Sequence, residues 1–381
     1  MISISNLINQ LAEAALEKKT DGILAQSLRN FPSPKELYPH AYTHGLGPLV
    51  YHALNQFDLT QHLPSQTTEK FKQAYYRTLS DNLRNQQALD ILRRNLSPEV
   101  PLLVLKGPAL IERIYLNPAL RPMTDIDLLI HPEHLPILKD CLHALNYGSP
   151  VQYPNIFIKN KVIFDIHTDP FHADRIKQRL EAVPLNLANL WQKAIPFANV
   201  ENLFMLSLPD QILTLSVHAL KHGYDRNIWL FDILLSLKLA HQSNTWPQVQ
   251  KHCSDHNASP ILALSLHAIQ IHLARNLPAS ICELQKSFPI GPIRRKILCA
   301  SPQSGNFQVL EPWVLSKQFP KRIDQLRFLV AFAFPKRAAL DQISGLSGRL
   351  HWLSYPYRIV QLLSLGTRQL AKLAYRLMGT P

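Results

Sequence analysis

Two aspartates separated by one residue lie in an apolar stretch near the middle of the chain, Asp125-Ile-Asp127-Leu-Leu-Ile130. In a β-strand, residues i and i+2 face the same way, so the two carboxylates project side by side, about 7 Å apart at Cα. The pair is unfavourable alone because like charges repel and each resists burial. Divalent cations remove this penalty, and Mg²⁺ prefers oxygen ligands. The pattern indicates a metal site, although strand ends and loops without a metal also show it.

A third carboxylate follows in Asp165-Ile-His167, directly after the strand-like run 162–164. We expect this segment to form the strand next to the first pair. Asp165 would ligate a metal and orient or deprotonate a nucleophile hydroxyl. His167 falls on the same strand face and would contact substrate or support Asp165. Two metals about 3.5–4 Å apart can clamp both oxygens of an in-line phosphoryl displacement.

Upstream, the apolar run 101–105 ends at Lys106-Gly107. A glycine at a strand-to-helix turn lets backbone N–H groups approach phosphate, and the N-terminus of a following helix favours anions. Lys106 and Arg121 are candidate contacts for a triphosphate, and Gly107, Thr124 and His167 complete the candidate nucleotide-binding set.

The whole ordered set of motifs is a more specific signal than the Asp125 and Asp127 pair alone. The chain resembles the nucleotidyltransferase superfamily of DNA polymerase β type, and more closely a bacterial group of nucleotidyltransferase family proteins. The motifs that carry the resemblance are Lys106-Gly107, Arg121-Pro-Met-Thr-Asp125-Ile-Asp127-Leu128 and Asp165-Ile-His167. The likeness also extends to the segment 46–50 and to His218-x₃-His222.

The resemblance implies that Asp125, Asp127 and Asp165 form a metal triad. It also implies Mg²⁺ or Mn²⁺, an NTP donor such as ATP, and transfer of a nucleoside monophosphate to a hydroxyl or phosphate acceptor. The wider superfamily has Gly-Ser at the turn, whereas Gly107 here precedes Pro108, which offers neither hydroxyl nor N–H. Lys106 would have to compensate in phosphate binding.

The elements expected around these residues give an α+β fold with a polymerase-β-like core and a mixed sheet. We predict a helical N-terminal region over 1–95, the α/β core over 96–185, a helical domain over 186–300 and a basic helical region over 301–381. Helices are expected over 68–96, 109–116, 210–220, 229–240, 246–256 and 259–273, with a helix after Pro132 and a hairpin turn at 159–161.

Composition excludes several classes of protein. The chain has 381 residues, a formal charge of +13 and 46% hydrophobic residues, which suits a globular protein of two or three domains. No signal peptide, bilayer-spanning run, Rossmann glycine motif or P-loop is present, so we expect a cytoplasmic protein. The four cysteines form no CxxC pair and are expected to be reduced and mostly buried.

Two further features have more than one interpretation. His218 and His222 share a helix face, and we favour a role in a pocket over a plain surface or a metal site. Asp225 and Arg226 follow in the next turn, where they would reach an acceptor, and Asp232 is a candidate for an internal ion pair. From 316 onward, eleven Lys or Arg stand against two Asp. This basic region is a solvated helical face, a polyanion-binding surface or an amphipathic membrane contact.

The sequence therefore predicts a metal-dependent nucleotidyltransferase that releases pyrophosphate. Its acceptor is open among protein, RNA, sugar and small metabolite. One alternative is a catalytically degenerate protein that binds a nucleotide or RNA. Another is a peripheral membrane or assembly protein of a polysaccharide or natural-product pathway.

Overall fold

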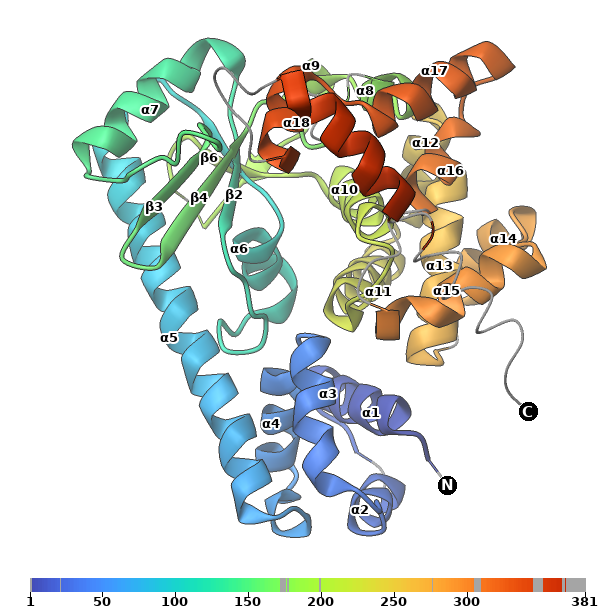
Figure 1. The fold of residues 1–381 in the computed structure, drawn as a ribbon. Helices are drawn as coiled ribbons and strands as arrows, with labels where there is room; N and C mark the ends of the chain where they lie inside the picture. The colour runs from blue at the N-terminus through green and yellow to red at the C-terminus, as the bar shows by residue number, and fades with distance from the viewer. Residues whose placement is uncertain are drawn as a thin grey trace.

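Helices flank a single mixed sheet in the computed structural model of the chain (Figure 1). The structure describes residues 2–20, 22–171, 176, 178–198, 200–275, 277–304, 310–344, 352–364 and 367. The α+β class and the helical flanks are confirmed. The division into four regions stays a prediction.

The N-terminal helices form a compact group that a long helix connects to the sheet (Figure 1). They are α1 (Ile4–Glu17), α2 (Gly22–Arg29), α3 (Leu37–Thr43), α4 (Gly47–Gln56) and α5 (Ser65–Asn95), with 3₁₀ turns at Pro34–Glu36 and Thr60–His62. The 31 residues of α5 run from this group to the back of the sheet. One helix thus carries residues both to the N-terminal group and to the sheet.

The sheet has six strands in the order β3-β4-β2-β1-β6-β5. The strands are β1 (Leu102–Val104), β2 (Ile126–Leu129), β3 (Ile156–Lys159), β4 (Val162–His167), β5 (Ile195–Pro196) and β6 (Leu203–Met205). Strand β2 pairs parallel with β4 and antiparallel with β1, and β1 pairs parallel with β6. Short helical elements connect them: α6 (Gly107–Leu110), a π-helical turn (Ile111–Tyr115), a 3₁₀ turn (Pro132–His134), α7 (Leu135–Ala144), α8 (Gln178–Ala182) and α9 (Leu187–Gln192).

The two faces of the sheet pack against different partners. One face packs on α5 and α7 and contributes Ile126, Leu128, Phe164 and Ile166 to a core shared with Leu89, Leu92, Leu138 and Leu142. The opposite face contributes Leu103 and Leu129 to the core of the surrounding helices. Because side chains alternate along a strand, the aspartates between these apolar residues must point toward the second face.

The hairpin predicted at 159–161 is confirmed, since β3 and β4 pair antiparallel across Asn160 and Lys161. Both residues have positive φ, 48° and 68°, as the tight hairpin turns with matching twist require. Strands β5 and β6 were not expected, because they lie in a part of the sequence that is mainly helical. Each is only two or three residues long, too short for a period-2 pattern to emerge.

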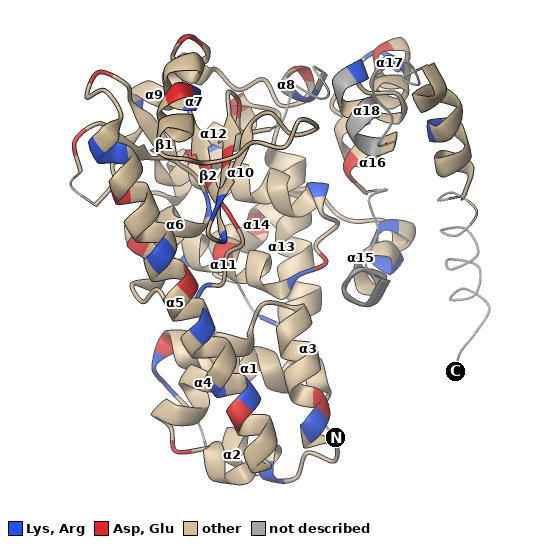
Figure 2. Cartoon of the chain, turned by 60° about the vertical axis from the view of Figure 1, so that its left-hand side comes forward, with Lys and Arg blue, Asp and Glu red and all other residues tan. Residues whose placement is uncertain are grey.

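The helices after the sheet are α10 (Leu208–Lys221), α11 (Asn227–Gln242), α12 (Trp246–Asp255), α13 (Ser259–Leu273), α14 (Ala279–Ser287), α15 (Pro292–Ser304), α16 (Leu310–Ser316), α17 (Arg322–Ala333) and α18 (Arg337–Ser344). The helices predicted within 210–273 are confirmed to within a few residues. Figure 2 shows Lys and Arg residues, drawn in blue, on α15 and α17. Four of the basic residues counted from 316 onward, Arg349, Arg368, Lys372 and Arg376, lie outside the described residues.

Polar contacts join the N-terminal helices to the helices that follow the sheet. The Asn9 side chain donates to the carbonyl of His272 at 2.7 Å, and Asn227 donates to Asn9 Oδ1 at 3.0 Å. The backbone N–H of Ile228 donates to the carbonyl of His44 at 3.1 Å. These contacts hold α1 and the turn before α4 against α11 and α13.

Within the described part of the chain, no helix is both long enough and apolar enough to cross a bilayer. All four cysteines are free, as predicted, but only Cys253 is buried, so the expectation that most of them are buried was wrong.

Candidate active site

Register and alternation bring the candidate acidic residues together on one face of the sheet. Asp127 lies directly opposite Asp165 in the parallel pair of β2 and β4. Ile126 and Phe164, one residue earlier on each strand, belong to the core on the other face. One oxygen each of Asp127 and Asp165 and one ring nitrogen of His167 all lie within 4.8 Å of one another, close enough to share a metal ion. The prediction that Asp165 lies on the strand next to Asp127 is confirmed.

Two neighbouring side chains contact the carboxylate of Asp127. Lys106 Nζ lies 2.7 Å from Asp127 Oδ1, and His167 Nε2 lies 3.1 Å from the same oxygen. Burial alone would raise the pKa of Asp127, but Lys106 and the hydrogen bond from His167 outweigh it and hold the pKa well below its usual range. Asp127 therefore stays ionised at any physiological pH.

The other two carboxyls have the opposite electrostatic surroundings. Burial raises the pKa of Asp165, and the charge of Asp127 adds to this although His167 opposes it. Burial and Asp127 likewise raise the pKa of Asp125, which accepts a hydrogen bond from Thr124 Oγ1 at 3.0 Å. Three carboxyls thus lie at one site with too few positively charged neighbours, and a divalent cation would reduce the repulsion among them.

Asp125 lies at the margin of this group. It precedes β2 and lines the adjoining cavity, but it is not part of the set formed by Asp127, Asp165 and His167. The geometry therefore gives His167 a more central place than the sequence suggested. The sequence does contain a pattern that indicates this position of His167, because residues 165 and 167 share a strand face.

Lys106 has an unusual backbone conformation, with φ 49° and ψ −116°. Glycine adopts this region readily, whereas a residue with a Cβ is strained in it. In this conformation Lys106 lies directly before α6, and its side chain contacts Asp127. The next residue, Gly107, has little free space, because an added Cβ would lie 3.0 Å from Met123 Sδ. Pro108 occupies the first turn of α6, where its missing N–H leaves no helical hydrogen bond unmade.

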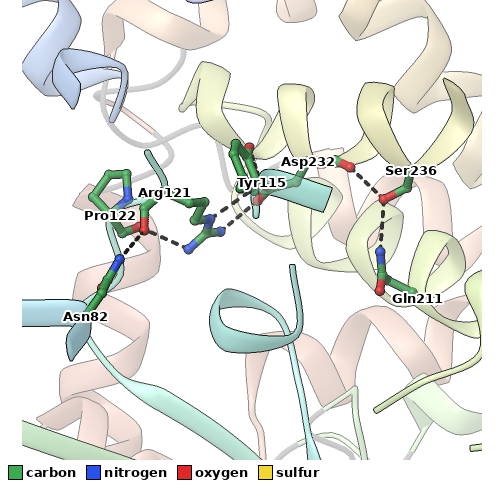
Figure 3. A network of polar contacts seen from close by, with 7 residues as sticks. All are labelled: Asn82, Tyr115, Arg121, Pro122, Gln211, Asp232 and Ser236. Carbon is green, nitrogen blue, oxygen red and sulfur yellow. Dashed lines mark hydrogen bonds and ion pairs between the residues drawn. The ribbon is translucent and has the colours of Figure 1, made fainter. Parts of the chain in front are cut away.

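Arg121 belongs to a buried polar network (Figure 3). Its guanidinium forms two contacts with Asp232 of α11, at 2.7 Å and 3.4 Å, and Tyr115 donates to the same carboxylate at 2.7 Å. Asn82 of α5 donates to the backbone carbonyl of Arg121 at 2.8 Å. The predicted internal ion pair of Asp232 is therefore confirmed. Arg121 ties the turn before β2 to both α5 and α11.

A cavity of about 670 Å³ opens beside the acidic group, within the usual size range for small-molecule sites. It is lined by three parts of the chain. The sheet side contributes Lys106, Gly107, Arg121, Thr124, Asp125 and Asp127; the N-terminal helices contribute Tyr38, Tyr42, Arg77, Thr78 and Asn82; and the helices after the sheet contribute His218, His222, Arg226, Ile228 and Trp229.

The pocket-facing interpretation of His218 and His222 is confirmed, since both line this cavity. Their rings lie 4.7 Å apart and contact Trp229 at 5.1 Å and 4.9 Å between centroids. Burial and then the charge of Lys221 lower the pKa of His222 to about 3. Burial and then Lys106 hold the pKa of His218 well below its usual range. Both rings are therefore neutral at pH 7.

The sequence did not indicate that the N-terminal helices line the cavity. Tyr38, Tyr42 and Arg77 belong to no chemical motif, and their placement depends on how α3 and α5 pack. The turn before α4 depends on Gly45, which has a φ of +72° and no room for a Cβ beside Ile228.

Comparison with known proteins identifies the family. A family model described as "Uncharacterised nucleotidyltransferase" matches residues 32–274. That span is more than half of the chain and includes the sheet, the acidic group and the cavity, so the protein belongs to this family of uncharacterised nucleotidyltransferases. No curated protein and no solved structure matches the chain.

Proposed function

We propose that the protein transfers a nucleoside monophosphate from an NTP to a hydroxyl or phosphate acceptor and releases pyrophosphate, on a sheet of the polymerase-β type. The observation that carries this proposal is the convergence of Asp127, Asp165 and His167 beside a cavity large enough for small-molecule substrates. Membership in the family supports the same reaction class.

The donor atoms fit a divalent cation. Two carboxylate oxygens and an imidazole nitrogen lie within 4.8 Å of one another, a set of ligand atoms that suits such an ion. We assign Asp125, Asp127 and Asp165 as ligands for Mg²⁺ or Mn²⁺, with His167 beside them. When bound, the cation would neutralise charge on the transferred phosphoryl group and its leaving group.

The protein's own residues bind and orient the reactants. Lys106, Gly107 and Thr124 are assigned to the NTP, and Arg121 positions their turn through its ion pair with Asp232. The acceptor oxygen forms a bond to the α-phosphorus while the bond from that phosphorus to the bridging oxygen breaks. The electron pair of the broken bond leaves with pyrophosphate. Asp165, whose pKa burial raises, takes the proton of the acceptor.

The test is the release of pyrophosphate by a purified double variant, Asp125→Asn with Asp127→Asn. We expect turnover of α-³²P-labelled NTPs, incubated with cell extract as the source of acceptor, to fall by about a thousandfold or more because the charge on the metal ligands is lost. The fold should persist, since relief of carboxylate repulsion offsets the lost contact with Lys106.

A matched control is Asp140→Asn on the exposed side of α7. It changes charge equally without touching the cavity and should keep full turnover. Unchanged pyrophosphate release in the double variant would remove the proposed mechanism. Identifying what becomes labelled would also name the acceptor, which the sequence left open among protein, RNA, sugar and small metabolite.

A nucleotide- or RNA-binding protein without catalysis is the alternative prediction. Calorimetry with Mg²⁺ and each NTP, combined with the labelling assay, separates the two. Tight binding with no labelled product on any acceptor would favour the binding protein.

Contact of the basic C-terminal region with a polyanion or a membrane surface also stays a prediction, as does a cytoplasmic location. Large apolar side chains are exposed there beside basic residues: Ile323, Leu326 and Val330 on α17, and Trp352, Tyr355 and Val360 further on. Exposed aromatic and aliphatic residues with Lys and Arg suit an anionic lipid interface. Flotation with anionic liposomes, with and without residues 340–381, tests this, and no difference would argue against it.

A further inference from the structure

Arg226 is a cation in the wall of the cavity, and the nearby charges of Asp225 and Asp232 act on it without a direct contact. Among the described residues it forms no ion pair, and its Nε atom is buried with no hydrogen-bond partner. Burial, and then repulsion from Arg121, lower the pKa of Arg226. A partly buried guanidinium that forms no ion pair keeps unused hydrogen-bond donors, so a residue of this kind in a cavity wall marks a position that an anion would complete.

One aromatic ring lies beside this guanidinium, and two imidazole rings lie against that aromatic ring. Arg226 Cζ lies 5.6 Å from the centroid of the Trp229 ring, and the rings of His218 and His222 contact the same tryptophan. The imidazoles are neutral, so they add polar edges and ring faces but no charge. The wall thus offers one cation within a group of ring surfaces.

This wall continues from the acidic group without joining it. Lys106, His222 and Arg226 all line the same cavity. Lys106 is already paired with Asp127 and Arg121 with Asp232, so both are anchored near the sheet. Arg226 has no such ion pair within the described part of the chain and lies between α10 and α11.

We infer that the wall formed by His222, Arg226 and Trp229 is the acceptor subsite, and that the acceptor is a small ring-containing molecule with an anionic group, a carboxylate or a phosphate. The inference rests on the proposed nucleotidyl transfer and narrows its acceptor to a small metabolite. The anion pairs with the guanidinium of Arg226 and the ring packs on Trp229, while the nucleotide phosphates lie at the Lys106 end. A cavity of about 670 Å³ with walls from three parts of the chain suits a small molecule better than a protein or RNA surface.

The experiment measures binding of phenyl phosphate, a ring with an anionic group, by calorimetry on the full chain. We expect wild-type protein to bind phenyl phosphate at least tenfold more tightly than inorganic phosphate, because only the former packs a ring on Trp229. Arg226→Gln should weaken phenyl phosphate binding at least tenfold, and Trp229→Phe severalfold. Arg29→Gln, an exposed arginine of α2 remote from the cavity, is the matched control and should bind normally.

Arg226→Lys provides a second variant if the glutamine form does not fold. This variant keeps the positive charge but cannot form bidentate hydrogen bonds, so it should bind phenyl phosphate with an intermediate affinity. Equal binding of phenyl phosphate by wild type, Arg226→Gln and Arg226→Lys would overturn the assignment.

A non-hydrolysable α,β-methylene NTP with Mg²⁺ distinguishes the acceptor from the nucleotide as occupant. We expect the analogue to bind wild type and Arg226→Gln alike and to leave phenyl phosphate bound. Displacement of phenyl phosphate by the analogue, with loss of analogue binding in Arg226→Gln, would assign the wall to the nucleotide and overturn the acceptor subsite. Normal phenyl phosphate binding with no turnover of any NTP would instead defeat the proposed function and leave the anion site standing.

Discussion

The two ends of the cavity differ in how their charges are balanced. At the sheet end, Lys106 pairs with Asp127 and Arg121 pairs with Asp232, so each cation has an anion within 2.7 Å. At the wall that contains Trp229, Arg226 forms no ion pair among the residues that the structure describes, and its Nε has no hydrogen-bond partner. The first end is organised before any ligand arrives, whereas the second is left for a ligand to complete. Charged residues in one cavity can therefore have structural and ligand-binding roles side by side.

The largest difference that we expect between the two arginines is in their contribution to the free energy of unfolding. Arg121→Gln would leave the fully buried carboxylate of Asp232 without its ion-pair partner. Breaking a buried pair in this way costs about 3–5 kcal/mol in the free energy of unfolding. Arg226→Gln should cost less than about 1 kcal/mol, or stabilise the protein, because it removes an unpaired charge. Denaturant titration of the two variants measures the difference.

Equal losses of unfolding free energy in the two variants would contradict the different roles assigned to the two arginines. The Arg29→Gln variant provides the baseline for removing an arginine from the surface, where substitutions are usually within about 0.5 kcal/mol.

The next effect concerns pH. Burial lowers the pKa of His44 and of His272 to about 4, and that of His222 to about 3. Unfolded histidines titrate near about 6.5, so between about pH 6.5 and 4 the unfolded state binds protons that the folded state does not. Stability should therefore fall as the pH decreases through this window, by up to about 1.4 kcal/mol per pH unit for each histidine.

Unfolding measured at pH 7.5, 6.0 and 5.0 tests this dependence. His222→Gln removes only the cavity member of the set, so it should reduce the slope while the contributions of His44 and His272 remain. A slope that does not change in His222→Gln would contradict the predicted neutrality of the cavity histidines.

The smallest expected effect is on metal affinity at the sheet end. Lys106 Nζ contacts the same carboxylate of Asp127 that a cation would bind, so we expect the lysine to compete with the metal when no nucleotide is bound. Lys106→Met should therefore strengthen Mn²⁺ binding by about tenfold, or about 1.4 kcal/mol, in the absence of nucleotide. Paramagnetic resonance of free Mn²⁺ gives the affinity directly. Lys70→Met, on the exposed side of α5, is the control and should leave affinity unchanged.

Weaker Mn²⁺ binding in Lys106→Met would show that the lysine supports the metal site rather than competing with it. His167→Gln measures the other neighbour of Asp127. If the imidazole ligates the metal, affinity should fall in that variant, whereas a role in orienting Asp127 alone would leave a smaller loss.

Much of the sheet end was predictable from the sequence because the signals there are local. Alternation along two strands places Asp127, Asp165 and His167 on one face, and the hairpin at Asn160 needs only neighbouring residues. The long apolar periods of α10 and α13 likewise gave helices close to their observed bounds.

The rest of the site depends on contacts between distant parts of the chain. The sequence did not show that Arg121 pairs with Asp232, which lies 111 residues away, while it also lines the cavity. Its contact with a triphosphate stays a prediction. No local pattern distinguishes an arginine that meets a buried carboxylate from one that meets a ligand. The contribution of Tyr42 and Arg77 to the cavity also arises from helix packing, which sequence spacing does not encode.

The parallel pairing of β1 with β6 has a consequence for synthesis of the chain on the ribosome. Strand β1 can meet β2 early, but its other edge stays open until Leu203–Met205 emerge, well after the hairpin of β3 and β4. An open edge is a template for unwanted pairing with other chains. A nascent polypeptide released before this closing strand would carry its acidic residues intact and yet be prone to aggregate.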